Sequence, residues 1–218
     1  MNTTREKLLN IYNLLLKHFG KQHWWPAETP FEVVVGAILT QSTSWKNVES
    51  TIENLKAEGI LTPAGIRRVK TKQLSKLIKP ALYHNVKAKK LKIFVDFLYK
   101  NYDGNLENFL KIKKNKLREE LLSIWGIGPE TADSIILYAA NKPSFVVDTY
   151  TKRVFKRLGL VKKEKSYDES REFFESNLPK SVKLYNEYHA LTVELGKNYC
   201  KNNPKCDGCP VKNLCSYR

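Results

Sequence analysis

The sequence predicts an all-α fold, because apolar residues recur at helical spacing along most of the chain and no segment alternates as a strand does. The first helix is expected to start at the capping-box pair Thr3 and Glu6 and to end at Gly20. The second helix, from Phe31 to Thr40, is apolar almost all round, which predicts a central position in the fold.

Further helices follow from the same spacing and from local start signals. Thr62 and Pro63 form such a signal, because threonine caps helix starts and proline suits the first turn. The remaining helices are expected at 45–58, 63–69, 71–78, 86–100, 105–110, 114–124, 130–140, 149–158, 167–178 and 183–197. The β-branched runs at 33–35 and 146–147 are too short to argue for a sheet.

The composition is that of a globular protein with a strong positive charge. The chain has 218 residues, of which 42% are hydrophobic, so one or two domains can form without disulfide staples. Lysine and arginine number 38 against 22 acidic residues, a net charge of +16. Such an excess of positive charge indicates a polyanionic partner. Nucleic acid is the commonest polyanion, and an anionic membrane surface is the alternative. Since the sequence contains no long apolar run and no signal-peptide pattern, we expect a cytoplasmic, nucleoid-associated protein.

A short glycine-containing turn between two predicted helices is the first candidate site. Gly126 and Gly128 permit a tight turn, Ile127 between them can anchor it in the core, and Pro129 suits the start of the next helix. The N–H groups at that helix start can bind a DNA phosphate. The alternative is an ordinary corner between two helices.

All four cysteines lie close to the C-terminus. Five residues separate Cys200 from Cys206, two separate Cys206 from Cys209, and five separate Cys209 from Cys215. Four thiolates can hold a [4Fe–4S] cluster or a tetrahedral zinc ion, and the spacing alone does not decide between them. Three of the four histidines, His18, His23 and His189, show no metal-ligand spacing and are expected to be structural or exposed.

Four motifs in order resemble the helix-hairpin-helix (HhH-GPD) DNA glycosylases of the endonuclease III superfamily. They are the segment Ala37–Thr43, the segment Tyr83–Ala88, the hairpin Leu-x-x-Trp-Gly-Ile-Gly-Pro-Glu-Thr-Ala with the later Val-Val-Asp-Thr, and the cysteine loop. The resemblance implies two helical domains with a DNA-binding cleft between them: a helical barrel with the hairpin at 30–142, and a second domain at 1–29 and 143–218 with the cysteine loop. It also implies a monomer that binds double-stranded DNA containing a damaged base, and it favours the iron–sulfur cluster over zinc.

The resemblance gives Asp148 the catalytic role in cleaving the N-glycosidic bond. A carboxylate there would stabilise positive charge on the sugar and orient water. The alternative is that Asp148 only caps the helix that follows it. Bifunctional members carry a lysine where this chain has Glu130, so the departure favours a monofunctional glycosylase.

The resemblance also implies residues that contact DNA. Trp24, Trp25 and Trp45 would form the base pocket, and the Trp-Trp-Pro segment is similar to that of short prokaryotic 3-methyladenine glycosylases. Indole faces suit positively charged alkylated purines, although these tryptophans could instead be core residues. Gln41 would fill the gap left by the flipped base, unless it is a surface amide that caps a helix. Gly126, Ile127, Gly128 and Thr131 would bind the DNA backbone. A uracil or oxidised-base glycosylase, with or without lyase activity, and a non-catalytic DNA-binding module remain alternatives.

Overall fold

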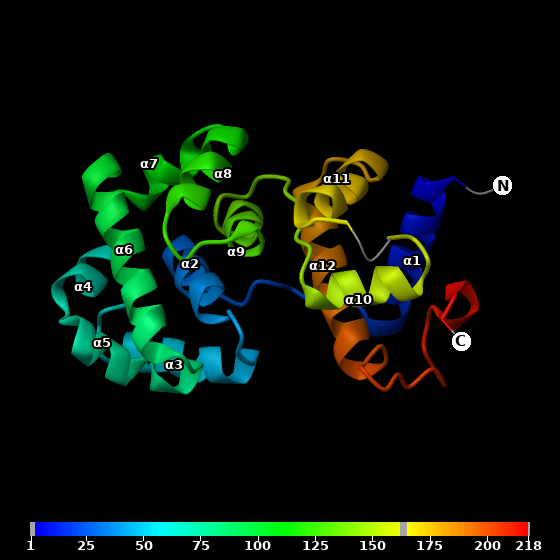
Figure 1. Cartoon of the computed structure of the whole chain (residues 1–218), viewed down its shortest axis with the longest axis horizontal. Coiled ribbons are helices and arrows are strands. Elements are labelled where there is room, and N and C mark those ends of the chain that lie inside the picture. Colours follow the sequence, from blue (N-terminus) through cyan, green and yellow to red (C-terminus); the bar gives the residue numbers. More distant parts are fainter. Residues whose placement is uncertain (1–2, 162–164, 218) are drawn as a thin grey trace. The chain divides into compact units, whose positions relative to one another are not determined.

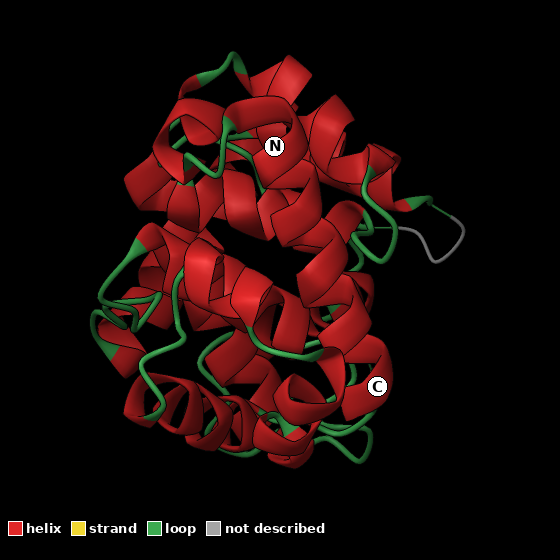
Figure 2. Ribbon diagram, turned by 90° about the vertical axis from the view of Figure 1, so that its left-hand side faces the viewer, coloured by secondary structure: helices red, strands yellow, loops and turns green. Residues whose placement is uncertain are grey.

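The computed structural model describes residues 3–161 and 165–217, and these residues form helices and loops without any strand (Figures 1 and 2). The predicted all-α fold is confirmed. The chain divides into two compact units, residues 1–26 with 143–218 and residues 27–142. The outermost ends of the predicted second domain, residues 1, 2 and 218, lie outside the described residues.

The unit of residues 27–142 is built around α2 (Pro30–Leu39), which is buried from Phe31 onward. Helix α6 (His84–Tyr102), the longest of this unit, packs against α2, and both lie beside shorter helices (Figure 1). These are α3 (Trp45–Ala57), α4 (Pro63–Arg68), α5 (Thr71–Leu77), η1 (Lys79–Ala81), α7 (Leu106–Lys111), α8 (Lys114–Ser123), α9 (Pro129–Ser134) and η2 (Ile135–Ala139). The nearly apolar sequence of α2 therefore has the central place that it predicted.

The other unit is built around α12 (Val182–Asn198), which packs against α1 (Thr4–Phe19) and α10 (Thr149–Arg157). Helix α11 (Tyr167–Asn177) and the single turn η3 (Lys212–Leu214) complete it. The buried Tyr188 of α12 donates its hydroxyl to the Leu8 carbonyl at 2.8 Å, which fastens α12 to α1. The predicted capping box at Thr3 is present at the start of α1.

Two helices differ from the predicted ones. Helix α6 begins at His84 and runs to Tyr102, beyond the expected 86–100, because left-handed residues, Tyr83 (φ 44°) and Asp103 (φ 52°), mark its two ends. The helix predicted at 130–140 widens after Ser134 into the π-helical segment η2. Apolar periodicity cannot separate an α-helical from a π-helical turn, so this change was not predictable. No helix in the described part of the chain is long and apolar enough to cross a membrane.

Candidate functional site

Asp148 lies directly before α10 and caps it. Its Oδ1 accepts a hydrogen bond from the N–H of Thr151 at 2.7 Å, so the capping interaction expected as an alternative is present. Its second oxygen, Oδ2, lies 3.7 Å from Nε2 of His189 on α12. Capping occupies only one carboxylate oxygen, and a role for Asp148 in chemistry is compatible with it.

The surroundings of Asp148 keep its carboxyl group ionised. Burial raises its pKa, but the His189 imidazole and the hydrogen bonds with Thr151 lower the pKa by more, so that it lies below its ordinary value. The side chain is 13% exposed. A carboxylate at this position is therefore anionic at neutral pH and reachable from outside.

Two of the predicted pocket tryptophans, Trp24 and Trp25, are linked to this carboxylate group through His189. The Trp24 ring stacks on the His189 ring, with centroids 5.5 Å apart and planes 29° apart. Trp25 stacks on Trp24 at 6.0 Å, and both indoles are half-buried. Trp24, Trp25 and Asp148 are thus joined through His189, a buried residue whose place beside Asp148 the sequence did not reveal. Trp45 belongs to the other unit, where its Nε1 donates to Glu49 at 2.6 Å.

The hairpin turn requires glycine at one of its two glycine positions. Gly126 has φ +90°, and a Cβ there would lie 2.5 Å from Cγ of Lys90. Ile127 is buried, as the sequence predicted, whereas Gly128 is the exposed N-cap of α9. Helix α6 lines this turn with basic side chains, since Lys89 also lies over the exposed ring of Trp125 at 4.9 Å.

Gln41 binds to the hairpin. Its amide nitrogen donates to the Gly126 carbonyl at 3.0 Å and to Oγ1 of Thr131 at 2.9 Å, while its oxygen accepts from Lys90. The side chain of Thr131 is buried, so it orients the hairpin, and a DNA contact by this residue would use its backbone N–H. In this conformation the Gln41 amide is neither a helix cap nor a group extended into solvent.

Comparisons with known proteins address the family to which this chain belongs. Residues 35–180 match the model of the HhH-GPD superfamily of base excision DNA repair proteins, which is more than half of the chain. The chain belongs to this superfamily. It is therefore a DNA N-glycosylase of base excision repair.

Relatives of this glycosylase include proteins of similar length. A protein of Methanocaldococcus jannaschii that bears the name of a DNA repair glycosylase is 54% identical over 96% of both chains. Endonuclease III of Thermotoga maritima is 31% identical over 93% of this chain and 89% of its own. Among solved structures, Helicobacter pylori 3-methyladenine DNA glycosylase bound to 1,N6-ethenoadenine has a TM-score of 0.78 and 32% identity, and the match covers 90% of this chain and 98% of that one. An endonuclease III–DNA complex has a TM-score of 0.83 at 24% identity, over 98% of this chain and 96% of that one, which shows the shared fold.

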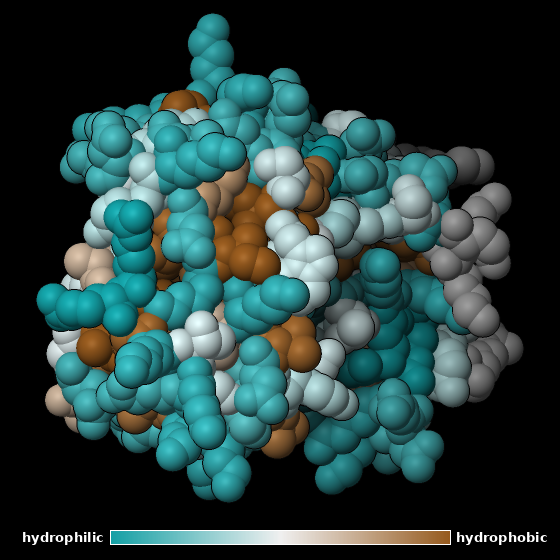
Figure 3. All heavy atoms as spheres, turned by 60° about the vertical axis from the view of Figure 1, so that its left-hand side comes forward, coloured by the Kyte–Doolittle hydropathy of each residue, from teal (hydrophilic) through white to brown (hydrophobic). Residues whose placement is uncertain are grey.

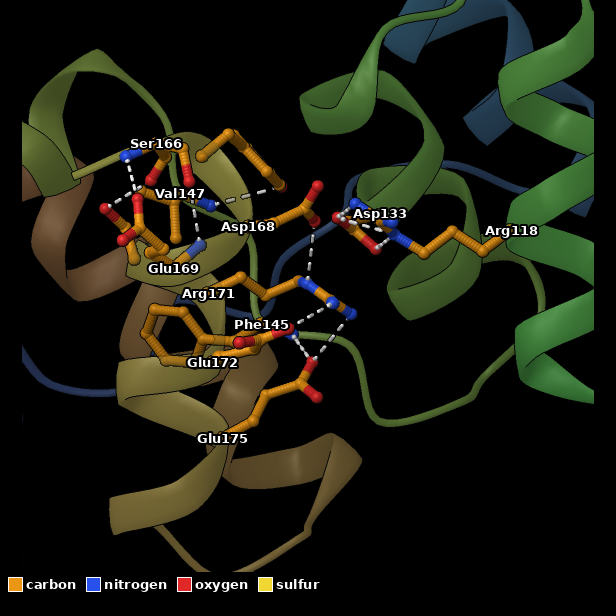
Figure 4. Close-up of polar contacts among 12 residues, drawn as sticks. Arg118, Asp133, Phe145, Val147, Ser166, Asp168, Glu169, Arg171, Glu172 and Glu175 are labelled. Carbon is orange, nitrogen blue, oxygen red and sulfur yellow. Dashed lines mark hydrogen bonds and ion pairs between the residues drawn. The ribbon is translucent and has the colours of Figure 1, made fainter.

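A buried ion pair that the sequence did not reveal fixes the second hairpin helix of the glycosylase. The Arg118 guanidinium, on α8, lies 3.1 Å from Oδ1 of the fully buried Asp133 on α9 (Figure 4). In the other unit, Arg171 of α11 makes ion pairs with Asp168 at 3.5 Å and Glu175 at 3.7 Å (Figure 4). Buried pairs of this kind are costly to break, so Arg118 and Asp133 hold the two helices of the hairpin, α8 and α9, against each other.

The four cysteines of the glycosylase line one cavity of about 100 Å³, as a shared metal centre requires. Burial raises the pKa of the Cys209 thiol, and the neighbouring thiols Cys200, Cys215 and Cys206 raise it further. Arg157 donates to Sγ of Cys200 at 3.4 Å. Four thiolates around one cavity are a donor set that fits a metal centre.

Proposed function

We propose that this glycosylase removes alkylated purines such as 3-methyladenine from double-stranded DNA, and that it is monofunctional. The observation that carries the proposal is the Trp24–Trp25 stack beside the anionic Asp148. The Trp24 ring already lies 5.8 Å from the Lys197 ammonium, so its face accepts a cation. An N-alkylated purine carries positive charge and would gain from the same interaction. The similarity to the Helicobacter pylori 3-methyladenine glycosylase supports this substrate class.

Asp148 would supply the electrostatic part of the reaction. As the bond between base and sugar breaks, positive charge develops on the deoxyribose, and an anionic carboxylate stabilises it. Oδ1 is held by the helix start, which leaves Oδ2 as the oxygen able to orient the attacking water. Because an alkylated purine is already a good leaving group, this single carboxylate is sufficient without a covalent intermediate.

The hairpin sequence supports the proposed absence of strand cleavage. Glu130, exposed in the first turn of α9, stands where a bifunctional enzyme needs an amine to form a Schiff base. A carboxylate cannot form that intermediate. The relatives named endonuclease III make a lyase the second candidate, and the experiments below separate the two activities.

We infer further that the cysteine loop holds a [4Fe–4S] cluster with Cys200, Cys206, Cys209 and Cys215 as ligands. When bound, the cluster would fold and stabilise the loop rather than take part in base removal. We also infer that the protein is a monomer that works on DNA in the cytoplasm and nucleoid, in keeping with its strongly basic composition.

The deciding experiment measures base release by wild type and by Asp148→Asn. Duplex DNA methylated with dimethyl sulfate is the first substrate, and duplexes with a single uracil, thymine glycol or 8-oxoguanine are the others. We expect wild type to release 3-methyladenine fastest. Asparagine caps a helix as well as aspartate does, so Asp148→Asn should keep its fold and its DNA affinity while excision slows about a hundredfold or more.

Asp103→Asn is the matched control, because it removes one exposed carboxylate in the other unit and asparagine also tolerates its left-handed backbone. Its excision rate should stay within about twofold of wild type, as for most surface changes. The DNA strand should remain intact until alkali is added. Undiminished excision by Asp148→Asn would reject the catalytic role, and borohydride trapping of wild type on DNA would reject the monofunctional assignment.

A further inference from the structure

His189 is a buried imidazole that contacts both parts of the candidate site. Its side chain is 6% exposed, its Nε2 lies 3.7 Å from Oδ2 of Asp148, and its ring stacks on Trp24 at 5.5 Å. A titratable side chain in the middle of a packed helix is costly unless its polar atoms are used. An apolar residue would fill the same space at less cost, so the imidazole points to a role beyond packing.

The two oxygens of Asp148 have different partners. Oδ1 is fixed by the Thr151 N–H at 2.7 Å, which belongs to the same helix start. That single hydrogen bond leaves the carboxylate plane able to rotate about the side-chain axis. The contact from His189 on α12 restrains the second oxygen and thereby sets the direction in which the carboxylate faces. Two contacts from two helices define an orientation that one contact cannot.

The imidazole is itself held in place. The neighbouring Tyr188 is fully buried and donates a hydrogen bond to the Leu8 carbonyl, which anchors this part of α12 to α1. The stack on Trp24 restrains the plane of the His189 ring. Because the position and the ring plane of His189 are both restrained, its contact can restrain the orientation of the Asp148 carboxylate.

We propose that His189 is a positioning residue for base excision, which orients Oδ2 of Asp148 and links the carboxylate to Trp24. The proposal rests on the catalytic role proposed for Asp148. His189 itself touches no reacting atom in this arrangement. Since it acts through Asp148, its removal should matter only while that carboxylate is present.

The charges around His189 favour this role. Helix α10 presents Asp148 to it, and the segment before α2 presents the uncharged Trp24. Two other charged residues of α12 have partners of their own: Lys197 lies over the Trp24 ring, and Glu187 accepts a hydrogen bond from the N–H of Gln22. From α1, Tyr12 packs on Tyr188. Asp148 is the charged group that these contacts bring to the imidazole. Without His189, burial would act on the Asp148 carboxyl with only the Thr151 contacts to oppose it, and its pKa would rise.

Two variants separate the contribution of the His189 Nε2 atom from that of its aromatic ring. His189→Phe keeps an aromatic ring for the Trp24 stack and removes Nε2, whereas His189→Gln places an amide nitrogen near the position of Nε2. Single-turnover release of 3-methyladenine from dimethyl sulfate-treated duplex DNA is measured from pH 3 to 8, because the pKa of Asp148 lies below its ordinary value of 3.8. For His189→Phe we expect a rate about tenfold lower at pH 7 and an unchanged DNA affinity, as expected when one contact to a charged group is lost. The acid limb of its pH–rate profile should move to higher pH. His189→Gln should recover part of the rate.

The same change in an Asp148→Asn background tests whether His189 acts through the carboxylate. The measured quantity is the slow residual release of 3-methyladenine, a base that is a good leaving group even without the carboxylate. His189→Phe should alter it less than about twofold, because the coupled partner is already gone. Equal losses in both backgrounds, or an acid limb unchanged by His189→Phe, would overturn the proposal.

A second readout separates this inference from the proposed function. The pKa of the Asp148 carboxyl can be followed by carbon-13 NMR in the free protein, without any DNA. Wild type that releases no base would reject the proposed function alone. The pKa of Asp148 should still rise in His189→Phe, and an unchanged value would reject the His189 role whatever the enzyme acts on. Circular dichroism and thermal unfolding confirm that each variant is folded.

Discussion

Lys87 is a buried lysine at the start of α6 that contacts two backbone segments. It is 2% exposed, and its ammonium donates to the carbonyl of Leu39 at 2.8 Å and to that of Ala81 at 2.5 Å. Leu39 ends α2 just before Gln41, and Ala81 precedes the exposed residues Leu82 and Tyr83. One side chain therefore fixes the ends of two surface loops next to the hairpin.

The charge of Lys87 makes stability depend on pH. Burial and, to a smaller extent, the neighbouring charge of Lys90 together lower its pKa to about 8. Between about pH 8 and the unfolded value of 10.5, the unfolded chain keeps a proton that the folded protein has released, so the free energy of unfolding should rise with pH through this window. Below pH 8 the full cost of burying the charge remains.

Lys87→Met tests this residue through urea unfolding at pH 7 and at pH 8 to 10. At pH 7 we expect the free energy of unfolding to fall by about 1–3 kcal/mol, because two carbonyl groups lose their charged donor. The rise in stability above pH 8 should become smaller as well, since Lys90, Lys92 and Lys142, whose pKa values burial also lowers, still contribute to it. The exposed Lys89→Met, two positions along the same helix, should change stability by no more than about 0.5 kcal/mol. Equal behaviour of the two variants would contradict the assignment.

Local signals predicted part of the site, and long-range packing determined the rest. The N-cap role of Asp148 could be predicted, because the cap and its partner Thr151 are three residues apart. Its contact with His189 could not, since it depends on how α10 packs against α12. Gln41 is a similar case: its segment could be aligned to a family motif, but its hydrogen bonds to Gly126 and Thr131 join loops far apart in the sequence.

At the scale of elements, the start signals were the most informative part of the sequence. Thr62 with Pro63 begins α4 as predicted, and the capping box begins α1, because each signal satisfies the backbone of its own first turn. The ends of α6 and the π-helical turn of η2 depend on backbone conformations that carry no periodic signature. The presence of the helices and the starts of α1 and α4 were thus predictable, while the ends of α6 and the π-helical turn were not.

Helix α10 connects Asp148 at one end with the cysteine loop at the other. Arg153 donates to the Cys200 carbonyl at 2.6 Å, and Arg157 donates to the Lys201 carbonyl at 2.5 Å. These bonds hold the first part of the loop even before any metal centre is considered. The Arg157 carbonyl also holds the end of the loop, because it accepts from the N–H of Ser216 at 3.1 Å and from the Cys215 thiol at 3.3 Å. The exposed ligand candidate Cys206 lies between these two anchored ends.

The iron–sulfur proposal predicts a coloured protein. Anaerobically purified protein should be yellow-brown with broad visible absorption, and iron and sulfide should be found at about four each per chain, as a [4Fe–4S] centre requires. Cys206→Ser should lose most of the colour, whereas the matched exposed change Ser216→Ala should keep it. Removal of iron by a chelator should lower the melting temperature, since metal binding contributes to folding. A colourless protein with one zinc per chain would reject the cluster.

At the scale of the whole molecule, charge is the dominant surface property. The net charge of +16 is spread over helices of both units, and the face drawn in Figure 3 is covered mainly by hydrophilic residues with smaller hydrophobic patches between them. A dispersed excess of this size attracts a polyanion along an extended surface. Binding to duplex DNA should therefore depend strongly on salt, whatever lesion the DNA carries.

Salt dependence also tests which lysines contact the DNA. Each phosphate neutralised by the protein releases counterions, so even a few contacts should reduce affinity for undamaged duplex at least about tenfold between 50 and 200 mM salt. Lys89, beside the exposed Trp125 of the hairpin, is a candidate contact, and Lys89→Gln should reduce the slope of log affinity against log salt by about one. Lys111→Gln is the matched control, because Lys111 is also exposed but is paired with Glu107 at 2.7 Å. If both variants lower the slope equally, the whole charge and not the hairpin determines binding, and the phosphate-binding role of the hairpin is wrong.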